Sequence, residues 1–367
     1  MLSNEIKYRY LFAGGGTGGH LYPAIAIAQK IKELQPNSEI IFIGTKDKIE
    51  SRVVPKLGFE FRPIIISGFS RKLTIKNILF PFKLIAGMMQ SLIINFKFKP
   101  HVAVGTGAYV SGPAIWGATF MGAKAILLEQ NSFPGITNRL LEKRARKIFL
   151  SFEESKKYFK DSSKLEVAGN PIRVDIKLTD KNEAKTEFGL EYSKKTLVII
   201  GGSLGAKSIN EAIKNNIDKI ISLGINVLWQ TGENYYESYS TLESENIKIT
   251  KYFDDIAKAY SAADLLLARA GATTIAEVAQ IGLPVIFVPS PNVAADHQYK
   301  NAKVLKDANA AELIGDSGID TKLISIINSL INNENKLETL RTNIKAFANP
   351  NAIKTISNEI IKMAATI

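Results

Sequence analysis

Residues 8–20 read YRYLFA-GGGTGGH, and Pro23 follows shortly after them. A short apolar run, a glycine-rich turn and a proline suited to the first turn of a helix together predict a strand–turn–helix unit. Glycine lets the backbone approach an anion closely, and the N–H groups at the start of the following helix attract that anion. His20 closes the turn, where a titratable imidazole would meet a substrate. The stretch therefore predicts an α/β fold whose first loop binds an anionic ligand.

The composition sets wider bounds. The chain has 367 residues, 46% of them hydrophobic and 22% charged, which is enough for two ordered domains. Its net charge of +12 implies an acidic partner, either nucleic acid, a phosphorylated metabolite or an anionic membrane. The absence of cysteine excludes disulfides and thiolate metal sites and fits a reducing compartment. The first residues do not resemble a signal peptide. Residues 78–96 are apolar but interrupted by Pro81, Lys83, Gln90 and Asn95, so we expect no membrane span there.

Apolar runs alternate with amphipathic helical stretches along the chain, as in parallel α/β layers. Gly169, Asn170 and Pro171 mark a hinge, which predicts Rossmann-like domains at residues 1–168 and 172–348 with ligands at the carboxyl ends of their strands. A last helix at 351–367 is expected to pack back on the first domain. The predicted strands are 8–13, 40–44, 61–65, 102–105, 125–129, 147–150, 196–200, 226–230, 247–251, 265–268 and 285–288.

The two glycine-rich regions differ in what they predict. The first satisfies the dinucleotide fingerprint, but the second strand ends FIGTK at 42–46 without the carboxylate that would hold a ribose, which counts against an NAD-dependent oxidoreductase. In the second half, Thr273 and Thr274 lie in a first helical turn suited to a diphosphate. Glu277 follows one turn later, and it either accepts hydrogen bonds from ribose hydroxyls or only complements the helix dipole.

Seven motifs occur in order: GGGTGGH at 14–20, GTGAY at 105–109, LEQN at 128–131, GNPIR at 169–173, GGSLGA at 201–206, RAGATTIAE at 269–277 and DHQ at 296–298. Together they resemble the MurG family of bacterial glycosyltransferases, glycosyltransferase family 28, over roughly residues 8–305. The resemblance implies a GT-B fold, two Rossmann-like domains with a cleft between them. It also implies inverting transfer of N-acetylglucosamine from UDP-N-acetylglucosamine to the 4-hydroxyl of the muramyl sugar of lipid I, giving lipid II for peptidoglycan.

The family resemblance also implies a setting. The enzyme would be a peripheral protein on the cytoplasmic side of the bacterial membrane, serving cell-wall growth, cell shape and division, with other wall-synthesis or division proteins as possible partners. No cofactor and no nucleic-acid partner are expected. The chain contains no Asp-x-Asp pair of the kind that holds a cation in metal-dependent sugar transferases, so metal-independent chemistry is expected. Another UDP-sugar enzyme of the same fold, a glycolipid synthase or an epimerase, is the nearest alternative.

Site roles follow from the matched positions. His20 is the first candidate for the base and Glu129, at the end of an apolar strand, the second; a structural hydrogen bond is the alternative for His20. Turn chemistry is the alternative for Asn131, packing for Tyr109 and an interdomain salt bridge for Arg173. The predicted substrate-binding residues are Thr17, Gly18, Gly19, Tyr109, Asn131, Arg173, Ser203, Asn210, Phe253, Ala272, Thr273, Thr274, Ile275, Ala276, Glu277 and Gln298. Among them, the resemblance implies that Phe253 lies in the segment that holds the uracil ring and that Gln298 contacts the donor sugar.

Two neighbouring stretches bear on the membrane. In residues 69–83, apolar side chains interleave with Arg71, Lys72, Lys76 and Lys83, which suits the boundary of an anionic bilayer or a protein–protein surface. In residues 84–96, apolar side chains recur at helical spacing and form one stripe. Such a stripe more often faces a core, and we expect it to do so here.

Overall fold

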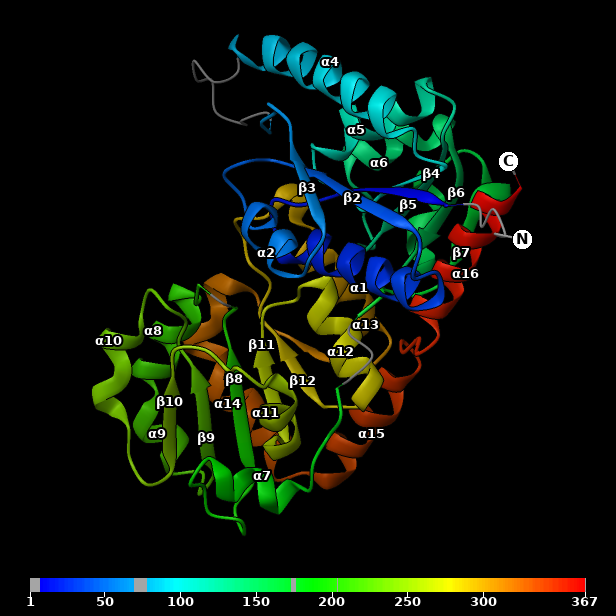
Figure 1. The fold of residues 1–367 in the computed structure, drawn as a ribbon. Helices are drawn as coiled ribbons and strands as arrows, with labels where there is room; N and C mark the ends of the chain where they lie inside the picture. Colours follow the sequence, from blue (N-terminus) through cyan, green and yellow to red (C-terminus); the bar gives the residue numbers. More distant parts are fainter. Residues whose placement is uncertain (1–6, 69–77, 173–175, 203, 367) are drawn as a thin grey trace. The chain divides into compact units, whose positions relative to one another are not determined.

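The computed structural model describes residues 7–68, 78–172, 176–202 and 204–366. The chain divides into two compact α/β units, shown as ribbons in Figure 1. The first, called the N unit below, comprises Met1–Val174 and Asn349–Ile367. The second, the C unit, comprises Asp175–Ala348. The division follows the Gly169-Asn170-Pro171 stretch closely, and the terminal segment returns to the N unit.

In the described residues of the N unit, seven parallel strands form one sheet in the order β3-β2-β1-β4-β5-β6-β7. The strands are β1 (Arg9–Ala13), β2 (Glu39–Gly44), β3 (Glu60–Pro63), β4 (Val102–Gly105), β5 (Lys124–Glu129), β6 (Ala145–Leu150) and β7 (Leu165–Val167). The helices are α1 (Gly18–Leu34), α2 (Glu50–Lys56), α4 (Phe80–Phe98), α5 (Ser111–Phe120), α6 (Ile136–Leu141) and α16 (Ala352–Ala365). Short 3₁₀ turns occupy Glu142–Arg144, Glu153–Tyr158 and Ser162–Lys164.

The described residues of the C unit form a second parallel sheet, in the order β10-β9-β8-β11-β12-β13. Its strands are β8 (Thr196–Ile200), β9 (Asn226–Gln230), β10 (Ile247–Thr250), β11 (Leu265–Ala268), β12 (Val285–Phe287) and β13 (Glu312–Leu313). Its helices are α7 (Lys181–Glu187), α8 (Lys207–Asn215), α9 (Ile217–Ile221), α10 (Tyr236–Tyr239), α11 (Ile256–Ala262), α12 (Ala272–Ile281), α13 (His297–Asp307), α14 (Ile319–Ile331) and α15 (Glu334–Lys345). Short 3₁₀ turns occupy Ser240–Leu242, Ala294–Asp296 and Asp316–Gly318.

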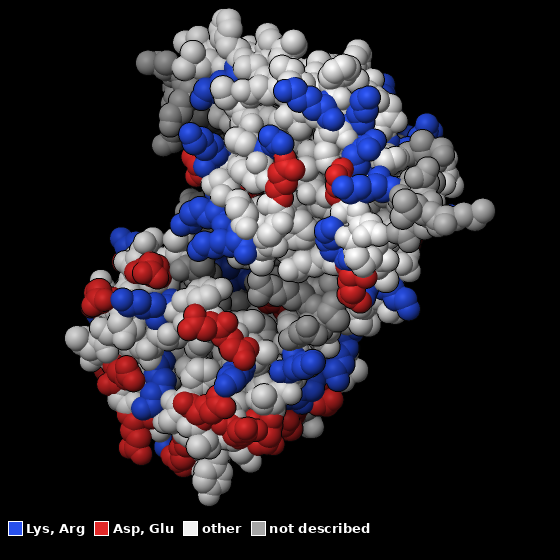
Figure 2. Space-filling model, in the orientation of Figure 1, with Lys and Arg blue, Asp and Glu red and all other residues white. Residues whose placement is uncertain are grey.

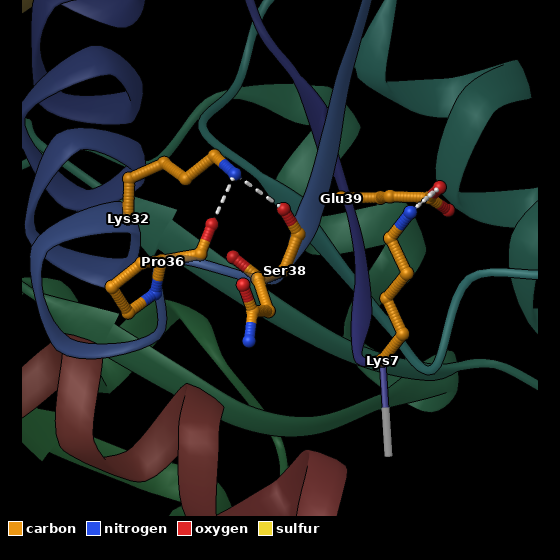
Figure 3. Close-up of a pocket in the computed structure, with 6 residues that line it drawn as sticks. Lys7, Lys32, Pro36, Ser38 and Glu39 are labelled. Carbon is orange, nitrogen blue, oxygen red and sulfur yellow. Dashed lines mark hydrogen bonds and ion pairs between the residues drawn. The ribbon is translucent and has the colours of Figure 1, made fainter. Parts of the chain in front are cut away.

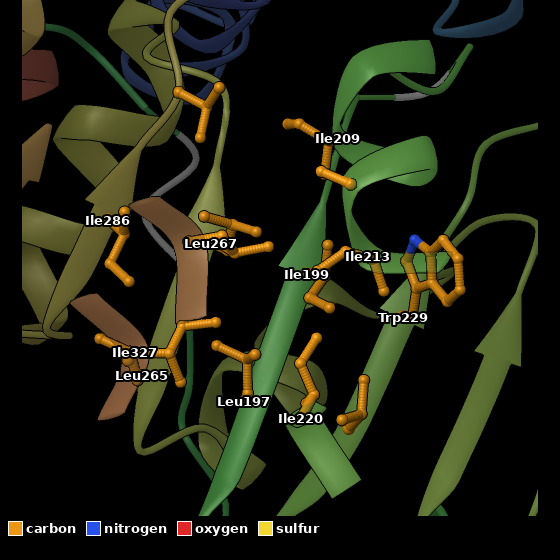
Figure 4. Packing of buried hydrophobic residues seen from close by; sticks show 14 of the residues in the cluster. Leu197, Ile199, Ile209, Ile213, Ile220, Trp229, Leu265, Leu267, Ile286 and Ile327 are labelled. Carbon is orange, nitrogen blue, oxygen red and sulfur yellow. The ribbon is translucent and has the colours of Figure 1, made fainter. Parts of the chain in front are cut away.

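The core of the C unit lies between its sheet and the helices that cover it (Figure 4). Leu197 and Ile199 on β8 lie beside Leu265 and Leu267 on β11, because alternate residues of a strand point to the same face. Helical side chains, among them Ile209, Ile213 and Ile327, pack against this layer, and Trp229 on β9 is fully buried within it. Each buried aliphatic side chain stabilises the fold by about 1.5–3 kcal/mol, so the strands that carry the site loops are firmly fixed.

The last helix belongs to the N unit. Ile356, Ile360 and Ala364 of α16 are buried in the same cluster as the apolar face of α1. The Lys124 ammonium on β5 donates hydrogen bonds to the backbone oxygens of Met363 and Thr366, the last described residue, at 3.2 Å each. The C-terminal helix therefore contributes to the core of the N unit.

Helix α4 corrects one expectation. Its inward side carries three small or polar residues, Gly87, Ser91 and Asn95, all buried. A Cβ at Gly87 would lie 2.8 Å from the carbonyl oxygen of Ile65, and Ser91 and Asn95 lie against α5. A Cβ at Gly117 of α5 would lie 2.6 Å from the Ser91 hydroxyl, so glycine is needed there for the two helices to approach each other. Most of the apolar stripe consequently points outward, and for these residues the expectation that the stripe faces a core is wrong, whereas Leu84 packs against the core of the N unit. The most exposed members of the stripe are Ile85, Met89, Ile93 and Phe96, and Phe82, just before the stripe, is exposed as well. None of the helices in the described segments has the length and hydropathy to span a bilayer.

Candidate active site

The loops of the N unit that carry predicted site residues share one edge of its sheet. All strand pairs in this sheet are parallel, so the carboxyl ends of β1, β2, β4 and β5 lie together. The glycine-rich loop, Thr45, the segment 106–109 and the segment 130–135 follow these ends directly. The structure therefore brings the N-unit candidates together at one site.

His20 has one ring nitrogen fixed. Its Nδ1 lies 2.8 Å from the carbonyl oxygen of Thr106 and 3.2 Å from Oε1 of Gln130. Both neighbours are acceptors, so we assign the proton of the neutral ring to Nδ1, which leaves Nε2 with the basic lone pair. Gly107 makes room for the ring, because its φ is 98° and a Cβ there would lie 2.8 Å from Nδ1. This geometry suits a general base that acts through Nε2.

The glycine-rich loop is built around a buried carboxylate that the sequence analysis did not single out. Glu50, the first residue of α2, is 1% exposed. Its Oε2 accepts the N–H of Gly16 (2.8 Å), and its Oε1 accepts the N–H and hydroxyl of Thr45 (3.0 and 2.7 Å). A Cβ at Gly15 would lie 2.3 Å from this carboxyl carbon. Glu50 thus holds the loop in the shape from which α1 begins at Gly18.

The start of α1 suits an anion. Thr17 is the N-cap residue and its side chain makes no capping hydrogen bond, and the first turn of α1 carries no acidic residue. The N–H groups and the dipole at a helix N-terminus attract negative charge. Thr17, Gly18 and Gly19 lie at this helix start, next to His20, and their role in substrate binding stays a prediction.

Glu129 is 2% exposed and fully engaged inside the protein. Its Oε1 accepts the backbone N–H (3.0 Å) and the side-chain amide (3.2 Å) of Asn131. Its Oε2 accepts the N–H of Gly135 (3.0 Å) and the amide of Asn138 (2.8 Å). Four donors around two oxygens indicate a carboxylate that shapes the loop after β5. The catalytic role of Glu129 stays a prediction, and this geometry favours a positioning role.

Two further N-unit candidates lie at the same edge. Tyr109 is half-buried; burial raises the pKa of its phenol, against the lowering effects of the Lys48 charge and of a hydrogen bond with Thr45. Asn131 is held by Glu129, and its backbone oxygen accepts a hydrogen bond from Ser155. Both residues thus follow strands that end at the same edge of the sheet as the loop of His20.

The carboxyl edge of the C unit presents a second anion site. Helix α12 begins directly after Gly271, and its first turn carries no acidic residue. The hydroxyl oxygen of Thr273 is buried and has no hydrogen-bond partner within the described part of the chain. A buried hydroxyl without a partner at a helix N-terminus is well placed for a bound anion. Ala272 and Ile275 are buried, and Thr274, Ala276 and Glu277 are half-buried around this helix start.

A buried glutamine links two loops of the C unit. Gln230, at the end of β9, is 2% exposed. Its Nε2 donates to the carbonyl oxygen of Gly202 (3.1 Å), and its Oε1 accepts the N–H of Phe253 (2.9 Å). One side-chain amide therefore fixes the second glycine-rich loop against the segment predicted to hold a uracil ring. Sequence reasoning missed Gln230, although its place at a strand end was a usable signal.

Arg269 joins three further loops at this edge. Its guanidinium donates to the carbonyl oxygens of Val288 and Pro289, to the Asp316 carboxylate and to the Ser208 hydroxyl. Nearby, the Oε1 of Gln298 accepts the N–H of Ser290 (2.8 Å). These contacts order the ends of β11 and β12, where Gln298 is predicted to meet the donor sugar.

Asn210 has a different place from the one expected. It is fully buried, its Nδ2 donates to the Thr231 carbonyl oxygen (2.9 Å), and its Oδ1 accepts the indole N–H of Trp229 (3.0 Å). Both ends of the amide are engaged inside the core, so a direct ligand contact for Asn210 is not supported. Arg173 and Ser203 lie outside the described residues.

A pocket lies at the opposite, amino edge of the N-unit sheet (Figure 3). The Lys32 ammonium there donates to the carbonyl oxygens of Pro36 (2.7 Å) and Ser38 (2.6 Å), and Lys7 pairs with Glu39 at 2.6 Å. Its charged side chains are thus already engaged in contacts within the protein, at the C-terminal end of α1 and the start of β2. Across the described segments, no group of three or more His, Asp or Glu side chains is arranged to hold a metal ion.

Comparisons with known proteins agree on one family. Residues 10–150 match the glycosyltransferase family 28 N-terminal domain and residues 196–356 its C-terminal domain. A protein of Flavobacterium psychrophilum named UDP-N-acetylglucosamine–N-acetylmuramyl-(pentapeptide) pyrophosphoryl-undecaprenol N-acetylglucosamine transferase is 43% identical, over 97% of this chain and 98% of its own. A protein of the same name from Cytophaga hutchinsonii is 41% identical, over 100% of this chain and 99% of its own.

Solved structures add the fold. The crystal structure of Acinetobacter baumannii MurG superposes with a TM-score of 0.76 at 27% identity, over 97% of this chain and 99% of that one. A Neisseria meningitidis UDP-GlcNAc 2-epimerase superposes with a TM-score of 0.67 at 14% identity, over 97% and 100%, which shows the fold alone. The two parallel-sheet units are those of the GT-B fold. The chain therefore belongs to the MurG family of glycosyltransferases, glycosyltransferase family 28.

Proposed function

We propose that the chain transfers N-acetylglucosamine from UDP-N-acetylglucosamine to the 4-hydroxyl of the muramyl sugar of lipid I. The observation that carries this proposal is the 43% identity, over nearly the whole of both chains, with a relative named for that reaction. In the reaction, the acceptor oxygen bonds to the anomeric carbon while the bond from that carbon to UDP breaks. The electron pair leaves with the diphosphate, and attack from the opposite face inverts the configuration.

The C unit supplies groups that suit the donor. The N-terminus of α12 and the Thr273 hydroxyl would stabilise the negative charge that develops on the departing diphosphate. The Glu277 carboxylate would accept hydrogen bonds from ribose hydroxyls, and the Phe253 segment would hold the uracil. Since Gln230 already fixes that segment to the glycine-rich loop, the donor would meet a site that is largely formed in advance.

The N unit supplies groups that suit the acceptor. The Nε2 of His20 would take the proton of the 4-hydroxyl as the new bond forms. The resulting imidazolium would be stabilised by the Thr106 carbonyl at Nδ1. The N-terminus of α1, with Gly18 and Gly19, would bind the diphosphate of the lipid-linked acceptor.

The deciding experiment measures UDP release from UDP-N-acetylglucosamine with a soluble lipid I analogue. It compares the wild type with His20→Ala and Glu277→Ala, each with and without EDTA. We expect acceptor-dependent, EDTA-resistant release that falls at least 100-fold in His20→Ala, the scale of a lost general base. Turnover of the nucleotide sugar without any acceptor would instead indicate an epimerase, and loss of the rate in Glu277→Ala alone would remove His20 as the base.

We also propose that the N unit docks on the cytoplasmic leaflet of an anionic membrane through the outer face of α4. Phe82, Ile85, Met89, Ile93 and Phe96 are each more than half exposed on one side of this helix. In Figure 2 the surface at the level of α4 is mostly uncharged, with Lys and Arg side chains below it. Apolar side chains with cations nearby favour an interfacial position on an anionic bilayer. Arg71, Lys72 and Lys76, the cations of the stretch 69–83 predicted to meet the membrane, lie outside the described residues.

Binding to liposomes tests this surface. The variant Ile85→Ser/Met89→Ser/Ile93→Ser should lose most of its co-sedimentation with vesicles that contain anionic lipid. Its matched control is Leu178→Ser/Tyr192→Ser, which removes exposed apolar side chains from the C unit. Transfer of N-acetylglucosamine to a short-chain soluble acceptor should stay unchanged in both. Undiminished vesicle binding by the α4 variant would reject the membrane assignment and favour a protein–protein surface.

A further inference from the structure

A buried tyrosine contacts the carboxylate that is expected to bind ribose. Tyr260 lies on α11, and only 4% of it is exposed. Its hydroxyl donates a hydrogen bond to Oε2 of Glu277 on α12, at 2.8 Å. The two residues are 17 positions apart and on different helices, so the contact depends on how α11 and α12 pack around β11. None of the roles described above accounts for this tyrosine.

Burial makes the hydroxyl a permanent donor. Burial is the largest cause that raises the pKa of Tyr260 well above its ordinary value, and the charge of Glu277 and the hydrogen bond to it act in the same direction. The phenol therefore keeps its proton throughout the physiological range. A hydrogen bond from a neutral donor to a carboxylate is stronger than one between neutral groups, and a buried hydroxyl without a partner is costly. Both effects hold the Glu277 carboxylate in one orientation.

Helix α11 also connects this contact to the uracil segment. Asp255 is the N-cap of α11, its carboxylate accepting the N–H of Ala257 at 3.0 Å. Phe253, two residues earlier, is fixed by Gln230. The short helix that starts at the uracil segment thus carries, one turn later, the hydroxyl that orients the ribose carboxylate.

We propose that Tyr260 is a positioning residue for ribose recognition, holding the Glu277 carboxylate ready for the ribose hydroxyls of the donor nucleotide. This inference rests on the proposed function, in which the C unit binds a UDP-sugar. A carboxylate on a helix surface samples several rotamers, and ordering it when the ligand arrives weakens binding. A site built to bond a hydroxyl also discriminates strongly against the ligand that lacks it. Tyr260 therefore contributes to the preference for ribose over deoxyribose.

The test measures dissociation constants of UDP and 2′-deoxy-UDP by calorimetry with the full chain. The variants are Tyr260→Phe, Glu277→Gln and the double variant. Tyr260→Phe keeps the ring and removes only the hydroxyl; it should weaken UDP binding by about tenfold or more, the scale of one hydrogen bond to a charged group. The UDP preference over 2′-deoxy-UDP should fall at least threefold. In the Glu277→Gln background, Tyr260→Phe should have no further effect on UDP.

Controls separate positioning from general destabilisation. Tyr239→Phe removes another buried phenol hydroxyl of the C unit, beside Trp229, and should leave both dissociation constants unchanged. In turnover, Tyr260→Phe should raise KM for the donor while kcat and KM for the acceptor stay near wild-type values. Equal weakening of UDP and 2′-deoxy-UDP, or an undiminished effect in the Glu277→Gln background, would overturn the inference. A wild type that binds no UDP would instead refute the proposed function.

Discussion

Replacing Glu129 by glutamine separates the two roles open to this residue. The carboxylate accepts four hydrogen bonds, two at each oxygen. A glutamine in the same place has one oxygen and one NH₂ group, so in either orientation two of the four donors would face another donor. Each buried donor left without an acceptor costs about 1–3 kcal/mol. Glu129→Gln should therefore destabilise the N unit by about 2–6 kcal/mol.

The assay is urea unfolding in the presence of saturating UDP. A bound nucleotide stabilises only the unit that binds it, so the unfolding transitions of the N unit and the C unit are separated. At roughly 2–4 °C per kcal/mol for a unit of this size, thermal unfolding of the N unit should occur roughly 4–24 °C lower. The control Glu39→Gln removes an exposed carboxylate paired with Lys7 and should cost no more than about 1 kcal/mol. UDP affinity should be unchanged in both variants.

The opposite pattern would refute this reasoning. The four hydrogen bonds do not hold the loop if the free energy of unfolding of Glu129→Gln lies within about 0.5 kcal/mol of the wild-type value, which is the ordinary range for a surface substitution. A fall in kcat of at least 100-fold at unchanged KM in that stable variant would then assign Glu129 to acid–base chemistry. A destabilised variant whose residual folded fraction keeps a near-normal kcat would establish the positioning role.

Three other predictions follow from single contacts. The chain has three histidines, so ¹⁵N NMR of labelled imidazoles should resolve His20 and show the proton on Nδ1; a proton on Nε2 would contradict the assignment from Thr106. Gln230→Met should weaken UDP binding about tenfold, because it removes the hydrogen bond that fixes the Gly202 loop and the one that fixes the Phe253 segment. An unchanged affinity for UDP in calorimetry would show that the link is dispensable. Burial raises the pKa of Asp264, but the hydrogen bond and charge of Lys181, the Thr196 N–H and the Lys185 charge outweigh it and hold the pKa below its usual range. Because this pKa is lower in the folded than in the unfolded state, the Asp264 carboxylate stabilises the folded protein at pH values above its unfolded-state pKa. The stability lost in Asp264→Asn, measured by urea unfolding, should therefore be largest near about pH 7 and shrink toward about pH 3. A loss independent of pH would refute the charge argument.

The sequence predicts the strands well because their signal is local. Each buried parallel strand is a short apolar run bounded by turn residues, and the predicted ranges agree with the observed ones to within a few residues. The strands it missed, Leu165–Val167 and Glu312–Leu313, are short, half-buried strands at sheet edges. Periodicity also located the stripe on α4 but not the side that meets α5, because that side is set by the close approach of Ser91 and Asn95 to Gly117.

The residues that hold the site were harder to find for a different reason. Glu50 joins nearby Thr45 to Gly16, which lies 34 positions away, and Gln230 contacts backbone groups at least 23 positions away. No local pattern reports such distant contacts. Motifs locate the groups that would touch a ligand, since those sit at strand ends and helix starts. The side chains that hold these groups in place lie beneath them, in stretches of sequence that carry no recognisable motif.

The two units hold their loops by different chemistry, and the difference has a physical consequence. In the N unit the braces are the carboxylates Glu50 and Glu129, which bind loop N–H groups strongly but place negative charge beneath an edge that is expected to receive an anion. In the C unit the braces are the neutral amides of Asn210 and Gln230, each engaged at both ends, and the Arg269 guanidinium, whose charge is paired with the Asp316 carboxylate. A neutral brace fixes a loop without repelling a diphosphate. Under the proposed function, this arrangement favours the C unit as the unit that stabilises charge developing on the leaving diphosphate, whereas an acceptor diphosphate bound by the N unit would only need to be held.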